Sequence, residues 1–98
     1  MNIIRNQNGG CLTIALEGRL DTTTAPELEK EIKLSLVGVT ELVMDFAKLD
    51  YISSAGLRVL LAAHKTMMKQ GSMKVVHANE MVMEVFEVTG FADILNIE

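Results

Sequence analysis

The chain has 98 residues, which suffices for a single domain spanning residues 1–98 and is too short for two cores. Apolar residues make up 49% and charged residues 22%, which excludes a disordered chain. The net charge of −4 disfavours nucleic acid and anionic membranes as partners, and no apolar stretch approaches the roughly 20 residues of a membrane span. With a single cysteine and no secretory signal pattern, we expect a cytoplasmic protein without direct membrane insertion.

The first part of the chain has the pattern of a β-hairpin. Apolar and more polar residues alternate over residues 11–18, as in a strand with one buried face. Ile3 and Ile4, before the turn sequence of residues 8–10, indicate a preceding strand. The lone Cys11 is interpreted as a small core residue, because it cannot form an internal disulfide.

A helix and a buried strand follow the hairpin. Thr24 and Glu27 have the spacing of a capping box, and Pro26 lies in the first turn, where its missing N–H is harmless. The expected buried face of this helix consists of Leu28, Ile32, Ser35 and Leu36. Residues 41–46 then form a near-continuous apolar run, which is typical of a central strand.

The second half of the chain repeats the alternation of helix and strand. A helix after Ser54 is expected to bury one stripe and to end before Gly71; this stripe consists of Leu57, Leu60, Leu61, His64 and Met68. Residues 73–76 form a further strand. Asn79 is placed to cap a last helix that Gly90 ends, and the residues after Gly90 form an apolar tail.

This order predicts an α/β fold. Strands joined through helices form parallel pairs, whereas the hairpin adds an antiparallel pair, so the sheet is mixed and has four or five strands. The three helices each have one apolar stripe, and we expect them to pack mainly on one face of the sheet.

The most informative segment is the start of the second helix, where Ser53, Ser54 and Gly56 follow a strand. The first turn of a helix has unpaired N–H groups and a partial positive charge, so it suits a hydroxyl cap or an added phosphate. We predict that Ser54 is the N-cap. As a helix glycine, Gly56 suggests a close approach by another backbone or by a partner.

Four stretches at these positions together resemble a known family. They are residues 17–21 (Glu-Gly-Arg-Leu-Asp), residues 45–46 (Asp-Phe), residues 51–57 (Tyr-Ile-Ser-Ser-Ala-Gly-Leu) and residues 89–91 (Thr-Gly-Phe). In this order and spacing they resemble the STAS domain of bacterial anti-sigma factor antagonists and of sulfate transporter tails. The resemblance covers essentially the whole chain and implies a STAS-type fold.

The resemblance also implies a phosphorylation switch. In the family, an anti-sigma factor that is also a serine kinase binds the unphosphorylated antagonist, phosphorylates one serine and lets go, and a serine phosphatase resets the cycle. The acceptor corresponds to Ser54 and the loop aspartate to Asp21. The partner-binding residues implied in this sequence are Asp21, Thr22, Ser53, Ser54, Ala55, Gly56 and Arg58.

This chain departs from the best-known members on both sides of the acceptor. They have an acid before it and Ser or Thr after it, where this chain has Ser53 and Ala55. Ser53 is therefore an alternative acceptor. The alternative function is a constitutive STAS subunit of a transporter ATPase or a larger signalling complex, in which Ser54 only caps a helix and contacts the partner.

No sequence pattern indicates an enzyme. The chain has neither a G-x-S-x-G elbow nor the glycine-rich phosphate loops, and His64 and His77 have no metal-ligand spacing around them. We expect a non-catalytic regulator without a cofactor or a metal.

Overall fold

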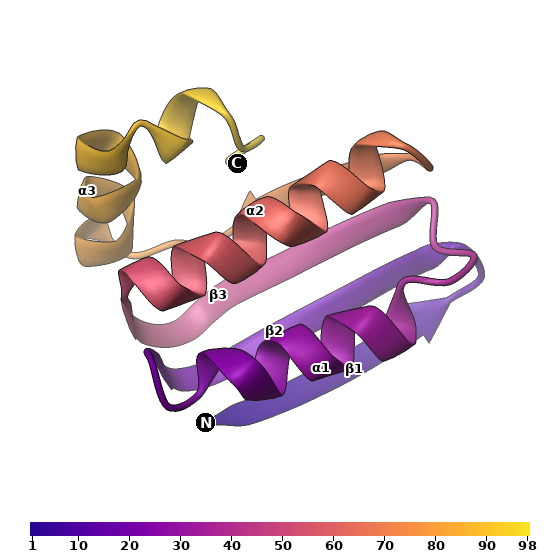
Figure 1. The fold of residues 1–98 in the computed structure, drawn as a ribbon, viewed down its shortest axis with the longest axis horizontal. Helices are drawn as coiled ribbons and strands as arrows, with labels where there is room; N and C mark the ends of the chain where they lie inside the picture. Colours follow the sequence, from indigo (N-terminus) through magenta and orange to yellow (C-terminus); the bar gives the residue numbers. More distant parts are fainter.

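The computed structural model describes residues 1–98 and contains four strands and three α-helices (Figure 1). The elements follow the predicted order: β1 (Asn2–Asn8), β2 (Cys11–Leu20), α1 (Ala25–Ser35), β3 (Glu41–Ile52), α2 (Ser54–Met68), β4 (Ser72–Val76), α3 (Glu80–Thr89) and a 3₁₀ turn (Phe91–Asp93). None of the helices combines the length and the apolar character needed to span a bilayer.

The four strands form one mixed sheet in the order β1-β2-β3-β4. β1 pairs antiparallel with β2, whereas β2, β3 and β4 are parallel to one another. Ile97 of the tail forms an isolated bridge with Val75 of β4, so the tail follows this edge without adding a regular fifth strand. The predicted α/β fold with a mixed sheet is confirmed.

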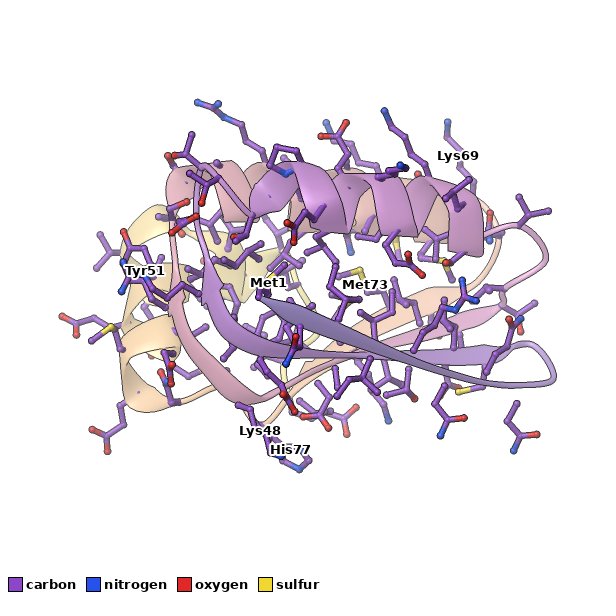
Figure 2. All side chains as sticks on the ribbon, turned by 90° about the horizontal axis from the view of Figure 1, so that it is seen from below. Met1, Lys48, Tyr51, Lys69, Met73 and His77 are labelled. Carbon is purple, nitrogen blue, oxygen red and sulfur yellow. The ribbon has the colours of Figure 1, made fainter.

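The sheet buries one face. α1 and α2 lie side by side on it, and the opposite face is left uncovered by helices (Figure 2). The alternation in β2 places Leu12, Ile14 and Leu16 in the core, where they have at most 1% of their surface exposed. α3 stands at the carboxyl end of β3 and β4 (Figure 1), and its Phe86 packs on Phe46 with the ring centroids 6.4 Å apart.

The buried face of α2 differs from the predicted stripe. Met67 is fully buried and Met68 is 56% exposed, whereas the sequence pattern had Met68 in the core. Val59 and Ala63 are also buried, because α2 packs against α1 as well as on the sheet. Compared with the predicted stripe, the buried face of α2 is therefore turned toward α1.

The burial of Cys11 also differs from the prediction. It is only half-buried, and its thiol lies 3.7 Å from a carboxylate oxygen of Glu41. Cys11 is the first residue of β2, and its side chain belongs to the half-exposed set of this strand, which alternates with the buried leucines and isoleucine.

β3 is twice as long as its predicted apolar run of residues 41–46 and reaches Ile52. Its register with β2 shifts at two places, so β3 has extra residues there and bends. At the first irregularity, the Asp45 carboxylate accepts a hydrogen bond from Ala47 N–H (3.0 Å) and lies 3.0 Å from His77 Nδ1. These contacts, first the one from Ala47, lower the pKa of Asp45. Beyond this irregularity β3 continues to Ile52, and the paired serines follow it directly.

Candidate functional site

The candidate site lies where β3 passes into α2. Here the structure corrects one prediction, because the N-cap is Ser53 and not Ser54. Ser53 is still extended (φ −101°, ψ 176°), since its N–H donates to the Leu20 carbonyl at 2.9 Å and prolongs the pairing of β3 with β2. The first helical hydrogen bond runs from Leu57 N–H to the Ser53 carbonyl (3.0 Å). Ser54 is thus the first residue inside the helix.

The two serines differ in accessibility. The Ser53 hydroxyl oxygen is buried, has no hydrogen-bond partner and does not cap the helix. Ser54 is exposed. The Ser54 hydroxyl is therefore accessible without opening the fold, whereas the Ser53 hydroxyl would first have to leave the protein interior.

Gly56 is explained by packing within this chain. It is buried in the first turn of α2, and a Cβ atom there would lie 2.6 Å from Leu20 Cγ and 2.9 Å from Ile52 Cγ1. These distances are too short for real contacts. The close approach is thus made by two core side chains and not by another backbone, as the sequence had suggested. The contact surface proposed below does not include Gly56.

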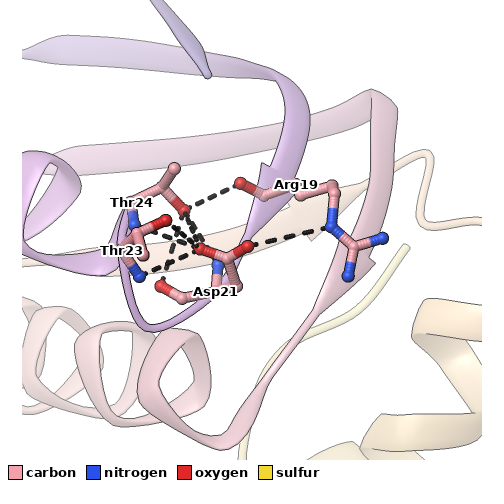
Figure 3. A network of polar contacts seen from close by, with 4 residues as sticks. All are labelled: Arg19, Asp21, Thr23 and Thr24. Atoms are coloured by element: carbon pink, nitrogen blue, oxygen red, sulfur yellow. Dashed lines mark hydrogen bonds and ion pairs between the residues drawn. The ribbon is translucent and has the colours of Figure 1, made fainter.

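The turn between β2 and α1 is built around Asp21 (Figure 3). Its Oδ1 atom accepts hydrogen bonds from the Thr23 hydroxyl (2.8 Å), from Thr23 N–H (3.0 Å) and from Thr24 N–H (3.2 Å). These bonds, chiefly the one from the Thr23 hydroxyl, lower the pKa of Asp21. Asp21 therefore holds the turn in shape as an ionised carboxylate.

The predicted capping box of α1 does not form. Thr24 is the N-cap residue, but its hydroxyl makes no capping bond. Instead it donates to the Arg19 carbonyl (2.8 Å) and accepts from Asp21 N–H (2.8 Å) (Figure 3). Because the hydroxyl is used inside the turn, it is not free to cap the helix.

Arg19 is a residue of this site that the sequence did not single out. Its guanidinium lies over the Tyr51 ring, 4.5 Å from the centroid, and its Nε is 3.7 Å from Asp21 Oδ2. Arg19 thus connects the end of β2, the end of β3 and the turn before α1. Both Arg19 and Tyr51 lie in the stretches that carry the family resemblance, but their contact depends on the register of β2 with β3.

The structure brings three predicted contact residues, Thr22, Ala55 and Arg58, to the wall of one hollow between the beginnings of α1 and α2. It has a volume of about 260 Å³, and Pro26 and Glu29 lie on its α1 side. No group of three or more His, Cys, Asp or Glu side chains is placed to hold a metal ion. The site is a shallow surface formed by a turn and a helix start.

The fold and this site define a STAS domain. The model of the STAS domain family matches residues 2–98, and the chain belongs to this family. It is 35% identical to BtrV of Bordetella bronchiseptica, a candidate anti-sigma factor antagonist, over 99% of this chain and 85% of the relative. It is 31% identical to the anti-sigma-B factor antagonist of Bacillus subtilis, over 99% of this chain and 90% of the relative.

Solved structures share the fold at lower identity. An anti-sigma factor antagonist from Mycobacterium paratuberculosis superposes with a TM-score of 0.89 at 23% identity, covering 98% of this chain and 83% of the other. The Bacillus cell fate determinant SpoIIAA, in its phosphorylated form, superposes with a TM-score of 0.77 at 17% identity, covering 99% and 91%. The predicted STAS-type architecture is confirmed.

Proposed function

We propose that this chain is an anti-sigma factor antagonist, a non-catalytic regulator that binds an anti-sigma factor with serine kinase activity. Phosphorylation of Ser54 ends this binding, and a serine phosphatase restores it. The names of the two relatives above 30% identity support the general role. The observation that carries the choice of residue is the exposure of Ser54 next to a neighbour whose hydroxyl is buried.

A phosphate on Ser54 fits the protein itself. Ser54 is at the start of a 15-residue helix, where free N–H groups and the helix dipole favour negative charge by about 0.3–1 kcal/mol. The first turn of α2 contains no acidic residue, and Arg58 lies four positions further on, on the same exposed side. We therefore expect phosphorylation to leave the fold intact.

The switch would then act at the interface. A phosphate carries about −1.5 to −2 charges, and burying it without a counter-charge costs several kcal/mol. Since each 1.4 kcal/mol or so changes affinity tenfold, a partner that covers Ser54 is released. The proposed contact surface consists of Thr22, Ser54, Ala55 and Arg58, with Asp21 holding the turn that presents Thr22.

Affinity capture from lysate of the native cells tests the proposal. The baits are the wild type, Ser54→Ala and Ser54→Asp, with Ser53→Ala as the matched control. We expect the wild type, Ser54→Ala and the control to capture the same small ATPase, and Ser54→Asp to bind it at least tenfold more weakly. Equal capture by Ser54→Ala and Ser54→Asp would contradict the switch. Equal capture of transporter components by all four baits would instead favour the constitutive subunit.

The acceptor residue is tested separately with the captured kinase and ATP. Mass spectrometry of the phosphorylated chain should find phosphate on Ser54, with no incorporation into Ser54→Ala and full incorporation into Ser53→Ala. Incorporation into Ser54→Ala at the wild-type rate would move the acceptor to another residue.

A further inference from the structure

The exposed side of α2 is basic. The helix contains no Asp or Glu, and Arg58, Lys65 and the C-cap residue Lys69 are all exposed. Their spacing of seven and four residues places them in one row along the helix. We refer to these three residues as the basic row.

An apolar groove runs beside the basic row, between α2 and α1. It has a volume of about 320 Å³, and its apolar lining includes Ile32, Leu36, Val59 and Ala63. The α1 rim is close to neutral, because Lys33 pairs with Glu29 at 3.0 Å. The groove and the row together form a surface suited to an apolar helix edge flanked by acidic side chains.

α3 has this complementary composition. Its charged residues are Glu80, Glu84 and Glu87, all exposed, and it contains no Lys or Arg. Met81 and Val88 lie on its exposed side as well, with 55% and 80% of their surface accessible. Within its own chain, α3 packs through its opposite face and stands away from the α1–α2 groove (Figure 1).

The charges of the two surfaces also match in spacing. Arg58 and Lys65 are seven residues apart, as are Glu80 and Glu87, and seven residues span about 10.5 Å of helix. α3 has ten residues and α2 has fifteen, so α3 is short enough to lie along α2. None of the basic-row or α3 glutamate side chains forms an ion pair within the chain.

We propose that α3 of one copy docks on the basic row and the α1–α2 groove of a second copy. The two surfaces are different parts of the chain, so the contact is head-to-tail, and a bound pair still presents one free groove on the first copy and one free α3 on the second. One helix edge in a shallow groove is a small interface, so the association is weak, reversible and sensitive to salt.

Sedimentation velocity of the full chain tests this proposal. At about 20 mM salt the weight-average sedimentation coefficient should rise between about 20 µM and 1 mM protein, and at about 500 mM salt this rise should disappear. The double variants Arg58→Glu/Lys65→Glu and Glu80→Lys/Glu87→Lys should each remain monomeric at low salt. Their equimolar mixture should recover the concentration dependence, because each variant then meets a surface of opposite charge.

The matched control is Lys30→Glu/Lys48→Glu, which changes the net charge by the same amount away from the basic row. It should self-associate like the wild type, and its mixture with Glu80→Lys/Glu87→Lys should show a smaller rise than the charge-swapped pair. Circular dichroism confirms that every variant is folded. A wild type that stays monomeric at about 1 mM and low salt would overturn the proposal, as would a folded charge-swapped pair that does not recover association.

The self-association does not depend on the proposed function, since its test uses this chain alone. One consequence does rest on it: Arg58 belongs both to the basic row and to the proposed partner surface, so the two contacts exclude each other. An excess of the captured kinase should then return the wild type to a one-to-one complex at low salt. A larger assembly that contains both proteins would show that the surfaces are separate.

Discussion

Gly56→Ala sets helix propensity against core packing. Alanine is favoured over glycine inside a helix by about 1 kcal/mol, so the substitution would stabilise an open position in α2. At Gly56 the new Cβ lies 2.6 Å from Leu20 Cγ, 2.9 Å from Leu20 Cδ2 and 2.9 Å from Ile52 Cγ1. Leu20 is 0% and Ile52 1% exposed, so neither side chain can move into solvent.

The packing cost should exceed the gain in propensity. Overpacking costs about 1–3 kcal/mol, and two buried neighbours place this case in the upper part of the range. We expect a net loss of about 1–2 kcal/mol in the free energy of unfolding, or roughly 4–16 °C in Tm for a chain of this size. Urea unfolding followed by circular dichroism measures it, with the exposed Ser54→Ala as a control expected to change it by about 0.5 kcal/mol or less.

A second background separates the two effects. In Leu20→Ala the nearest colliding atom is gone, so Gly56→Ala should cost at least about 1 kcal/mol less there than in the wild type. Stabilisation of the wild type by Gly56→Ala would refute the packing argument. An equal loss in both backgrounds would show that Leu20 is not the neighbour that limits residue 56.

Three further predictions concern the N-cap residues of α3 and α2 and the dependence of stability on acid pH. Asn79→Ala should lower the free energy of unfolding by about 1–2 kcal/mol. The Asn79 side chain caps α3 by accepting a hydrogen bond from Val82 N–H at 2.8 Å, and its amide nitrogen also donates to the Leu49 carbonyl. A change below about 0.3 kcal/mol would contradict this role. Ser53→Ala should be neutral or slightly stabilising, since it removes a buried hydroxyl without a partner; a loss as large as that of Asn79→Ala would show that the hydroxyl is satisfied. The folded-state pKa of Asp45 is lowered, so its contribution to stability is present above the unfolded pKa, near 3.8, and is lost as the pH falls through the folded-state pKa. Asp45→Asn should therefore reduce the loss of stability between about pH 5 and pH 2, measured by urea midpoints, and an unchanged pH dependence would contradict the assignment.

Much of the fold could be predicted because the signals are local. The alternation of apolar and more polar residues predicted β2, and the helical spacing of Leu28, Ile32 and Leu36 predicted α1. Asn79 and Gly90 predicted the two ends of α3. The predicted cap at Asn79 is confirmed, with a left-handed residue at Gly90 (φ 83°). Thr24 is the N-cap residue of α1, but the predicted capping bond of its side chain does not form. Its hydroxyl is used instead by a turn whose hydrogen bonds the sequence pattern does not encode.

For the candidate site, the sequence by itself determined which residues stand next to one another at the start of the second helix. Paired serines after a strand and before a helix located the helix start, and the resemblance assigned a role to Ser54. Only the tertiary structure decided that Ser53 is the N-cap residue, with a buried hydroxyl that makes no capping bond, and that Ser54 is accessible. The deciding hydrogen bond comes from Ser53 N–H to Leu20 in another strand, and the same strand closes the space above Gly56. A local pattern can specify the type and order of elements, whereas exposure depends on contacts between segments that are distant in the chain.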